Sequence, residues 1–327
     1  MAERLIITNG DAATTQMREA GIEAELLPWR DILHDGPVPG GLGLAELSRI
    51  RSQYIASISG LPPEQVSFRE RDAVVRNHAQ HQHIELWFEH DLVDQLQLIQ
   101  LLNFFGDEER TDRICLVQAD DYLGLQSAEA LRALEGRRRD VTLEQFGLAS
   151  QAWAAFTAET PETLGALAFT DEPALPYLAS ALRRLLQELP ATGSGLSLTE
   201  QRILAALAGG PRKVGQLFEV TQGQDEARFL GDSSFFKRID GLAFAATPLI
   251  EGVPFPSKRI AGGREHRDQY FAFVGSSVSL TEAGRAALAG RFDHTRENKI
   301  DRWLGGTHLA PETPWRRDEN GRPILVA

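Results

Sequence analysis

The sequence predicts an α/β protein: a Rossmann-like parallel sheet with helices on both faces, then a helical segment and a winged-helix-like domain. Short apolar runs such as 5–8 (LIIT) and 84–88 (IELWF) alternate with amphipathic stretches, which is typical of strands that alternate with helices. After the Pro- and Gly-containing segment 190–195 the alternation ends and a helix-rich pattern begins. These observations predict three parts: an α/β domain at 1–140, a helical connector with a linker at 141–195, and a winged-helix-like domain with a tail at 196–327.

The α/β domain is predicted to contain four strands, each leading through polar residues toward a helix. Asp11 is placed to cap the first helix, and Gly21 is placed to end it. The expected strands are 5–8, 22–27, 84–88 and 113–118, and the expected helices are 12–20, 44–59, 63–80, one from 92 onward, 127–134 and several within 141–189. Because strands alternate with helices, the sheet is predicted to be parallel.

The region after residue 195 is predicted to form a winged helix, a variant of the helix-turn-helix. Ser197 and Glu200 have the spacing of a capping box before the first helix, and Asp232 or Ser233 is placed to cap the third. The expected helices are 201–208, 214–220, one within 229–242, and a closing helix at 279–288. Two strands are expected near 246–250 and 269–274, with a basic loop between them.

Charge and composition limit the classes of function. The chain has 327 residues and a formal net charge of −12. Residues 1–195 hold 16 basic and 30 acidic side chains, whereas residues 196–327 hold 18 and 16. The first part is therefore expected to repel a nucleic-acid backbone. The sequence has neither a signal-peptide layout nor an apolar run near the ~18 residues of a membrane span, so a cytoplasmic protein without membrane contact is expected.

Polar clusters fall at the carboxyl ends of the predicted strands, where α/β proteins bind their ligands. The clusters are Asn9 with Asp11, then Arg30 with Asp31, His34 and Asp35, then Glu89 with His90 and Asp91, and finally Asp120 with Asp121. Since parallel strands end at one edge of a sheet, these side chains are expected to converge there. The convergence predicts a ligand-binding site or a metal-assisted phosphoester-hydrolysing site.

Each candidate has a role in that prediction. The catalytic candidates are the carboxylates and imidazoles of Asp11, His34, Asp35, Glu89, His90 and Asp91. Oxygen ligands suit Mg²⁺ or Mn²⁺, and a histidine can transfer protons near neutral pH. The candidates for binding phosphate in a small-molecule or nucleotide ligand are Asn9, Arg30, Arg69 and Arg71. The structural alternatives are helix caps at Asp11 and Asp91, a buried ion pair of Glu89 and His90 at the strand end, and a solvated helix face at 69–72.

His90 receives a specific orientation in this prediction. Alternation along the strand points Glu89 and Asp91 to one side and His90 to the other. His90 is then expected to face the cleft, with Asp11 or His34 opposite. The sequence contains no G-x-G-x-x-G, no P-loop, no H-E-x-x-H and no G-x-S-x-G motif, so the corresponding dinucleotide, nucleotide, zinc and serine sites are not predicted.

The alternative prediction is a regulator whose α/β domain senses a small molecule and whose winged helix binds DNA, as a homodimer. Two groups of basic residues are placed to contact nucleic acid: Lys237 and Arg238 on the third helix, and Lys258, Arg259, Arg264 and Arg267 in the basic loop. A protein-interaction or dimerisation module is the other interpretation of the same domain.

Several motifs together resemble a known family. IITNGD at 6–11, LPWRDILHDGPVP at 27–39, FRERD at 68–72 and LWFEHDLVDQLQLIQLL at 86–102 resemble the family called domain of unknown function 1835. The resemblance covers about the first 120 to 150 residues, and segments 279–290 and 300–309 look like the C-terminal portion of bacterial members. Asp35 and Val93 stand where members often have Glu and Tyr. The family carries no established activity, so the resemblance implies no catalytic residues.

Overall fold

The computed structural model describes residues 3–106, 111–170, 173–260 and 264–326, without the side chains of 264 and 265. Its largest sheet has five strands in the order β2-β1-β3-β4-β5. Neighbouring pairs among the first four strands are parallel, whereas β5 pairs antiparallel with β4. The strands are β1 (Arg4–Thr8), β2 (Glu25–Pro28), β3 (His83–Phe88), β4 (Ile114–Gln118) and β5 (Arg139–Asp140). The mixed α/β class and the parallel pairing of the four predicted strands are confirmed.

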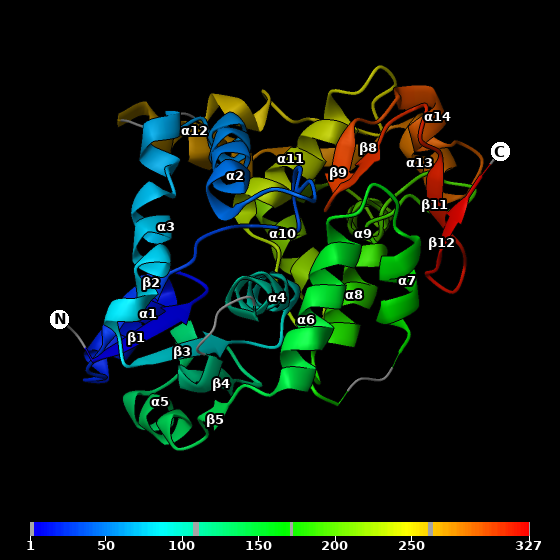
Figure 1. Cartoon of the computed structure of the whole chain (residues 1–327). Coiled ribbons are helices and arrows are strands. Elements are labelled where there is room, and N and C mark those ends of the chain that lie inside the picture. Colours follow the sequence, from blue (N-terminus) through cyan, green and yellow to red (C-terminus); the bar gives the residue numbers. More distant parts are fainter. Residues whose placement is uncertain (1–2, 107–110, 171–172, 261–263, 327) are drawn as a thin grey trace.

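Both faces of this sheet are covered by helices, because apolar side chains point alternately to either side of each strand. Leu5, Ile7 and Leu86 point into a large core with α4 (Leu92–Gly106), α6 (Leu143–Phe156) and α8 (Leu178–Leu186). Ile6 and Trp87 point into a smaller core with α1 (Asp11–Glu19) and α5 (Ala128–Glu135). Figure 1 shows α4 between the sheet and α6, with α5 on the opposite side.

The remaining helices before residue 195 pack around α4 and the sheet. They are α2 (Leu44–Ser59), η1 (Pro63–Val66), α3 (Arg69–Arg76), η2 (His78–Gln80), η3 (Thr111–Arg113), η4 (Leu123–Leu125) and α7 (Glu162–Ala168). The helix predicted at 44–59 is confirmed. The single helix predicted at 63–80 is wrong, since the structure has a 3-10 turn, an α-helix and a second 3-10 turn there.

The segment expected as a linker, 190–195, is a packed turn. The Ala191 N–H donates to Leu196 O (2.9 Å), and Ser194 O accepts from the His294 N–H (2.8 Å). An isolated bridge also joins Ala191 to Arg317. The large apolar core continues across the turn, from Leu5 to Trp315. The parts of the chain on either side of 190–195 therefore share one core.

The part of the chain after residue 195 combines helices with small sheets. The helices are α9 (Leu198–Leu207), α10 (Val214–Gln222), α11 (Asp232–Ala243), η5 (Ser257–Arg259), α12 (Arg264–Val274), α13 (Glu282–Leu288) and α14 (His294–Asn298). The strands β6 (Arg212–Lys213), β8 (Ser277–Leu280) and β7 (Ile250–Glu251) form one sheet in that order. Two hairpins pair β9 (Arg302–Leu304) with β10 (Thr307–Leu309), and β11 (Trp315–Arg317) with β12 (Pro323–Leu325).

Two details of that region differ from prediction. The strand expected at 269–274 is part of α12, and the strand that follows is β8. Ser279 belongs to β8, so the closing helix begins later than expected. Its N-cap is Thr281, whose hydroxyl accepts from the Gly284 N–H (3.0 Å). Apolar β-branched and aromatic residues at 269–274 suit a strand by propensity, but tertiary packing of Phe273 favours the helix. Among the described helices, none combines the length and apolar character needed to cross a bilayer.

The first residues of three helices test the predicted N-caps. Ser197 and Glu200 form the predicted capping box, with bonds of 3.2 and 2.8 Å. The helix expected to be capped by Asp11 begins at Asp11 itself, and its N-cap is Gly10. Likewise Asp232 is the first residue of α11, after Gly231 as N-cap. Asp11 is therefore free to bind another side chain.

Candidate metal centre at the end of β3

The centre of interest lies where the sheet order changes direction. From β1 the chain moves to β2 on one side, and it then returns to place β3 on the other side of β1. Crevices at such switch points, beyond the carboxyl ends of the strands, are where open α/β sheets bind ligands. Thr8 of β1 is in register with Trp87 of β3, so Asn9 and Glu89 leave the sheet at nearly the same level.

Three buried carboxylates meet at this point. Glu89, Asp91 and Asp94 each place one carboxylate oxygen within 4.8 Å of the other two. Their exposed fractions are 3%, 4% and 1%. They come from the end of β3 and the first turn of α4, so the close approach is fixed by a strand-to-helix turn. An arrangement of this size can hold one metal ion.

Each carboxylate is positioned by neutral hydrogen-bond donors. Glu89 Oε1 accepts from the Leu123 N–H (2.7 Å). Asp91 Oδ1 accepts from the N–H groups of Val93 (2.8 Å) and Asp94 (3.2 Å), so Asp91 caps α4 as predicted. Asp94 Oδ1 accepts from the Glu89 N–H (2.7 Å), and its Oδ2 accepts from Asn9 Nδ2 (2.9 Å).

The three acids make one another harder to ionise. Burial, followed by the charge of Asp91, raises the pKa of Glu89 to about 8. Burial also raises the pKa of Asp91, although the backbone N–H groups of Asp94 and Val93 oppose that shift. For Asp94, burial and the charges of Asp91 and Glu89 raise the pKa well above its usual value. The cluster thus favours either bound protons or a bound cation.

A comparison with the other buried acids sets this cluster apart. Nine Asp and Glu residues are buried among the described residues, and six of them form an ion pair with an arginine or lysine. The six are Asp31, Asp35, Asp72, Glu85, Glu188 and Glu200. The three without such a partner in the described part of the chain are Glu89, Asp91 and Asp94. The unpaired buried negative charge is therefore concentrated at one place.

His90 lies beside this cluster with part of its ring exposed. Its ring centroid is 5.5 Å from that of Tyr122 and 6.0 Å from that of Tyr177. Nδ1 has no hydrogen-bond partner among the described residues. The expected neighbours Asp11 and His34 are wrong: Asp11 binds Arg30, and His34 packs against Phe229. The sequence could not show that two tyrosines from later segments reach this position.

Asp11 and Arg30 form an exposed pair near the ends of β1 and β2. Arg30 Nε and Nη2 donate to the two Asp11 oxygens at 2.8 and 2.6 Å. The guanidinium of Arg30 is the largest cause that lowers the pKa of Asp11. Both side chains satisfy each other, so neither joins the carboxylate cluster. Arg30 has a positive φ of 61°, a backbone conformation that is uncommon for residues other than glycine.

His34 and Asp35 belong to a second buried cluster, on the side of α2 and α11. Asp35 Oδ1 accepts from Lys237 Nζ (3.2 Å), which also bonds the Tyr54 hydroxyl. Burial lowers the pKa of His34 to about 4, and neither ring nitrogen has a partner among the described residues. The predicted convergence of all four polar clusters is therefore wrong, because His34 and Asp35 bind this second set of residues.

The two arginines expected to clamp phosphate have different surroundings. Arg69 is exposed, whereas Arg71 is buried between the rings of Trp29 and Phe68, at 3.8 and 3.9 Å from their centroids. Arg71 also donates to Trp29 O, the Ser48 hydroxyl and Asp72. These contacts make Arg71 a structural group.

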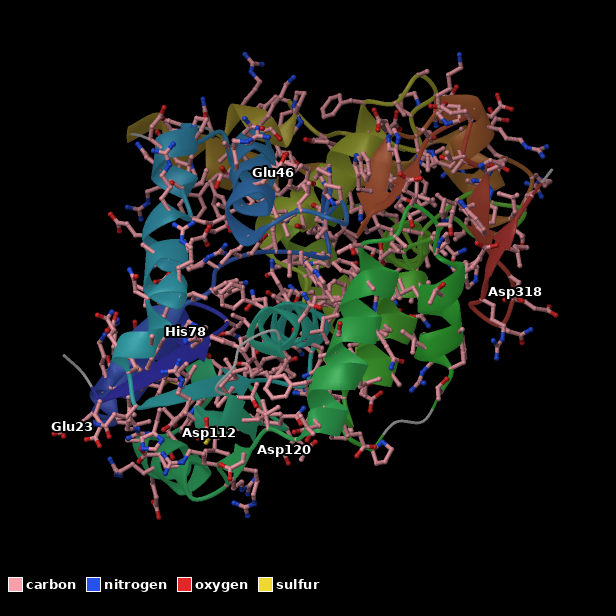
Figure 2. All side chains as sticks on the ribbon, in the orientation of Figure 1. Glu23, Glu46, His78, Asp112, Asp120 and Asp318 are labelled. Atoms are coloured by element: carbon pink, nitrogen blue, oxygen red, sulfur yellow. The ribbon has the colours of Figure 1, made fainter. Side chains whose placement is uncertain are left out.

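Figure 2 shows Asp120, from the fourth predicted cluster, at the outside of the fold, where it is exposed.

The basic residues proposed for DNA contact also divide into two sets. Lys237 and Arg238 lie on α11, which packs against α2, and Arg238 is only 8% exposed. Arg238 is thus held inside the fold, and Lys237, whose side chain is 31% exposed, is bonded to Asp35. This packing does not favour the predicted entry of these two side chains into a DNA groove. Lys258, Arg259 and Arg267 are exposed. The side chain of Arg264 lies outside the described residues.

Asp94 is the residue of this centre that the sequence interpretation missed. It lies three positions after Asp91, and residues at that spacing share one face of a helix. The signal was therefore present in the sequence as D-x-x-D at the start of a helix. It was hidden because polar residues within the apolar stretch of α4 look like its solvent face, although Asp94, Gln95 and Gln97 are all buried.

Comparisons with known proteins assign no family. No family model matches the chain, and no curated protein matches it either. Among solved structures it is similar to the DNA-binding, cleavage and re-ligation domain of Plasmodium falciparum topoisomerase II, with 13% identity and a TM-score of 0.41. That alignment covers 99% of this chain and 54% of the other, so this chain spans about half of its length. A TM-score of that size assigns neither a fold nor a function.

Proposed function

We propose that the α/β domain binds a divalent cation, Mg²⁺ or Mn²⁺, at Glu89, Asp91 and Asp94, and uses it to hydrolyse a phosphate ester. The observation that carries the proposal is the contrast among buried acids: these three alone, within the described residues, have no arginine or lysine partner. Six buried acids have their charge balanced by a basic side chain, so a cation is the consistent counterpart for the remaining three.

The chemistry of the donors favours a hard cation. The three candidate ligand groups at the centre are carboxylates, and their oxygens suit Mg²⁺ and Mn²⁺ better than softer metals. Mg²⁺ is commonly bound by one or two carboxylates together with substrate phosphates. A bound cation would polarise a phosphate oxygen and neutralise charge that develops during hydrolysis.

The residues around the centre would supply the rest of the reaction. Asn9 orients Asp94 through its amide, at 2.9 Å. The Nδ1 atom of His90 has no hydrogen-bond partner in the described part of the chain, and its ring is half-buried, so His90 is placed to move a proton between the site and solvent. The strand order β2-β1-β3-β4 supports a Rossmann-like interpretation, in which the ligand binds between the ends of β1 and β3.

Metal titration of matched variants tests this function. Mn²⁺ should raise the melting temperature of the wild-type chain, by mass action worth about 2.7 kcal/mol at a hundredfold excess over Kd. Glu89→Gln and Asp94→Asn should lose that response. Glu85→Gln is the matched control, since Glu85 lies on β3 four residues before Glu89, is fully buried and is paired with Arg4 at 2.8 Å. It should be less stable but should keep its response to Mn²⁺.

Hydrolysis is measured with p-nitrophenyl phosphate and bis-p-nitrophenyl phosphate, with and without Mn²⁺ or Mg²⁺. Activity that depends on the metal and disappears in Glu89→Gln supports the proposal. If millimolar Mn²⁺ and Mg²⁺ leave the wild-type melting temperature unchanged, protons alone balance the cluster and the proposal fails. Metal binding without turnover of either ester would reduce the function to ligand binding.

A second candidate is a small-molecule-sensing regulator with a DNA-binding winged helix. Three helices, α9 to α11, together with the small sheet β6-β8-β7, whose strand β6 lies between α9 and α10, support that interpretation, and Lys258, Arg259 and Arg267 are exposed. The packing of α11 on α2 does not favour entry of this helix into a DNA groove. DNA binding would then depend on contacts between these exposed residues and DNA phosphates. A combined Lys258→Gln and Arg259→Gln change should abolish any electrophoretic shift of DNA at low salt, and no shift by the wild type would end this candidate.

A further inference from the structure

A pocket of about 240 Å³ lies between α11 and the segment that joins α14 to β9. It is separate from the carboxylate centre, and most of its charged lining is basic. The basic or titratable lining residues are Lys237, Arg238, His294, Lys299 and Arg302. The acidic ones are Glu200, Asp240 and Asp301. Whether the pocket attracts an anion depends on which of these charges are already balanced.

The acidic lining residues are all engaged. Asp240 accepts three hydrogen bonds from Ser257, two from its N–H at 2.9 Å and one from its hydroxyl at 2.6 Å. Asp301 Oδ1 lies 2.7 Å from His308 Nε2. Glu200 Oε1 accepts from Arg302 Nη2 at 3.0 Å. Among the acidic lining residues, only Glu200 forms an ion pair with an arginine or lysine of the pocket. From outside the lining, Asp35 pairs with Lys237 at 3.2 Å, and Glu188 lies 3.8 Å from Arg238.

The two buried arginines still have donors without acceptors. Arg238 is 8% exposed, and its Nε has no hydrogen-bond partner among the described residues. Its ion pair with Glu188 spans 3.8 Å, which is too long for a hydrogen bond. Arg302 is also 8% exposed, and its Nη1 lacks a described partner. Buried arginines normally have their donors satisfied, so two incomplete guanidinium groups in one pocket indicate a missing acceptor.

We infer that this pocket binds the phosphate group of a small ligand, either inorganic phosphate or a phosphomonoester. Guanidinium groups recognise phosphate through paired N–H donors, and Arg238 and Arg302 approach from two different elements, α11 and β9. The exposed Lys299 lies at the same pocket and adds positive charge. The volume is below the roughly 300 to 1,000 Å³ of drug-sized pockets, so the bound group is small.

The test uses the full chain with EDTA present, so that the carboxylate centre binds no metal and cannot contribute. Inorganic phosphate and glycerol 3-phosphate are titrated separately, and the melting temperature is compared with sodium chloride at equal ionic strength. Both phosphates should raise the melting temperature more than the salt does. The tighter of the two identifies the source of the phosphate group. If neither exceeds the salt at 20 mM (about a hundred times a Kd of ~0.2 mM, where a bound ligand adds about 2.7 kcal/mol), the inference is wrong.

Variants locate the binding in this pocket. Arg238→Gln should weaken phosphate binding about tenfold or more, the range expected for losing charge-assisted hydrogen bonds. Lys299→Glu changes an exposed residue and should fold normally while weakening binding severalfold. Lys213→Gln removes an exposed lysine that does not line the pocket, so phosphate binding should stay unchanged.

The exposed variant keeps the test decisive if Arg238→Gln does not fold. Equal phosphate affinity in Lys299→Glu and in the wild type would then overturn the inference. Reduced affinity in Lys299→Glu, with Lys213→Gln unchanged, would support it. EDTA is present throughout, so a failure of phosphate binding does not count against the proposed metal centre. A failure of metal binding likewise does not count against this pocket.

Discussion

The carboxylate of Asp94 accepts a hydrogen bond from the backbone N–H of Glu89 at 2.7 Å. This bond closes the first turn of α4 back onto the end of β3. It places one buried acid on the backbone of another, and Asp91 lies between them in sequence. The turn therefore holds the three carboxylates together without any basic side chain. Such an arrangement is costly unless protons or a cation reduce its charge.

The first prediction concerns pH. The pKa of Glu89 is raised to about 8 in the fold, above its ordinary 4.5, so the native state holds a proton that the unfolded chain loses. That contribution to stability is complete below pH 4.5 and is lost as pH rises toward 8. Without metal, Glu89→Gln should therefore gain stability relative to the wild type between pH 5 and 8, by at most about 1.4 kcal/mol per pH unit.

Urea unfolding at several pH values, with EDTA present, measures this difference. Repeating the series with Mn²⁺ should reverse the trend for the wild type, since the ion replaces the proton. If the difference in unfolding free energy between Glu89→Gln and the wild type does not change with pH, Glu89 is ionised in the metal-free fold.

The second prediction concerns His90. His90→Ala should abolish the metal-dependent hydrolysis while the melting temperature changes by only a few degrees, because the ring is half-buried and Nδ1 has no described partner to lose. Melting temperature and Mn²⁺ response are measured on the same sample. A large fall in melting temperature, with the Mn²⁺ response and turnover retained, would show that His90 is structural.

The third prediction compares two arginines that are two residues apart on α3. Arg71→Ala should destabilise the protein by about 3 to 5 kcal/mol, because it leaves Asp72 buried and removes a guanidinium packed on Trp29. Arg69→Ala is the control; that side chain is exposed, so its effect should stay within about 0.5 kcal/mol. Chemical denaturation measures both. Similar stability for the two variants would contradict the role given to Arg71.

The fourth prediction concerns acid. Burial lowers the pKa of His34 to about 4, so the native state resists a proton that the unfolded chain accepts near pH 6.5. The fold should lose stability through this group as pH falls from 6.5 to 4. His34→Gln cannot take up that proton, so its stability relative to the wild type should improve over the same range. His83→Gln, at an exposed histidine, serves as control. If the difference in unfolding free energy between His34→Gln and the wild type stays the same from pH 6.5 to 4, His34 is charged in the fold.

Sequence patterns predicted the sheet well because its strands are buried on both faces and are bounded by clear turns. Leu5–Thr8 and Ile84–Phe88 lie within the strands that formed. The capping role of Asp91 was also visible, since a cap needs only residues nearby in sequence. The order of the strands along the sheet was not visible, because it depends on contacts between distant segments.

The site was only half predictable for the same reason. Glu89 and Asp91 are close in sequence, and Asp94 is one helical turn further on, so local geometry brings them together. His34 was assigned to the same edge, yet Phe229 and the α11 side of the fold determine its position. Lys237 looked like an exposed helix residue, but α11 packs on α2 and turns it toward Asp35. Long-range packing of this kind leaves no periodic signal.

The turn at 190–195 also has a consequence for the order of events during synthesis. Ala191 and Ser194 find their backbone partners at Leu196, His294 and Arg317, and two of these emerge from the ribosome more than 90 residues later. At roughly 5 to 20 residues per second, the turn waits several seconds or more for them. Meanwhile the parallel strands before residue 120 already have all their pairing partners. We therefore expect the sheet to form during translation and the second half to be locked in place only after it.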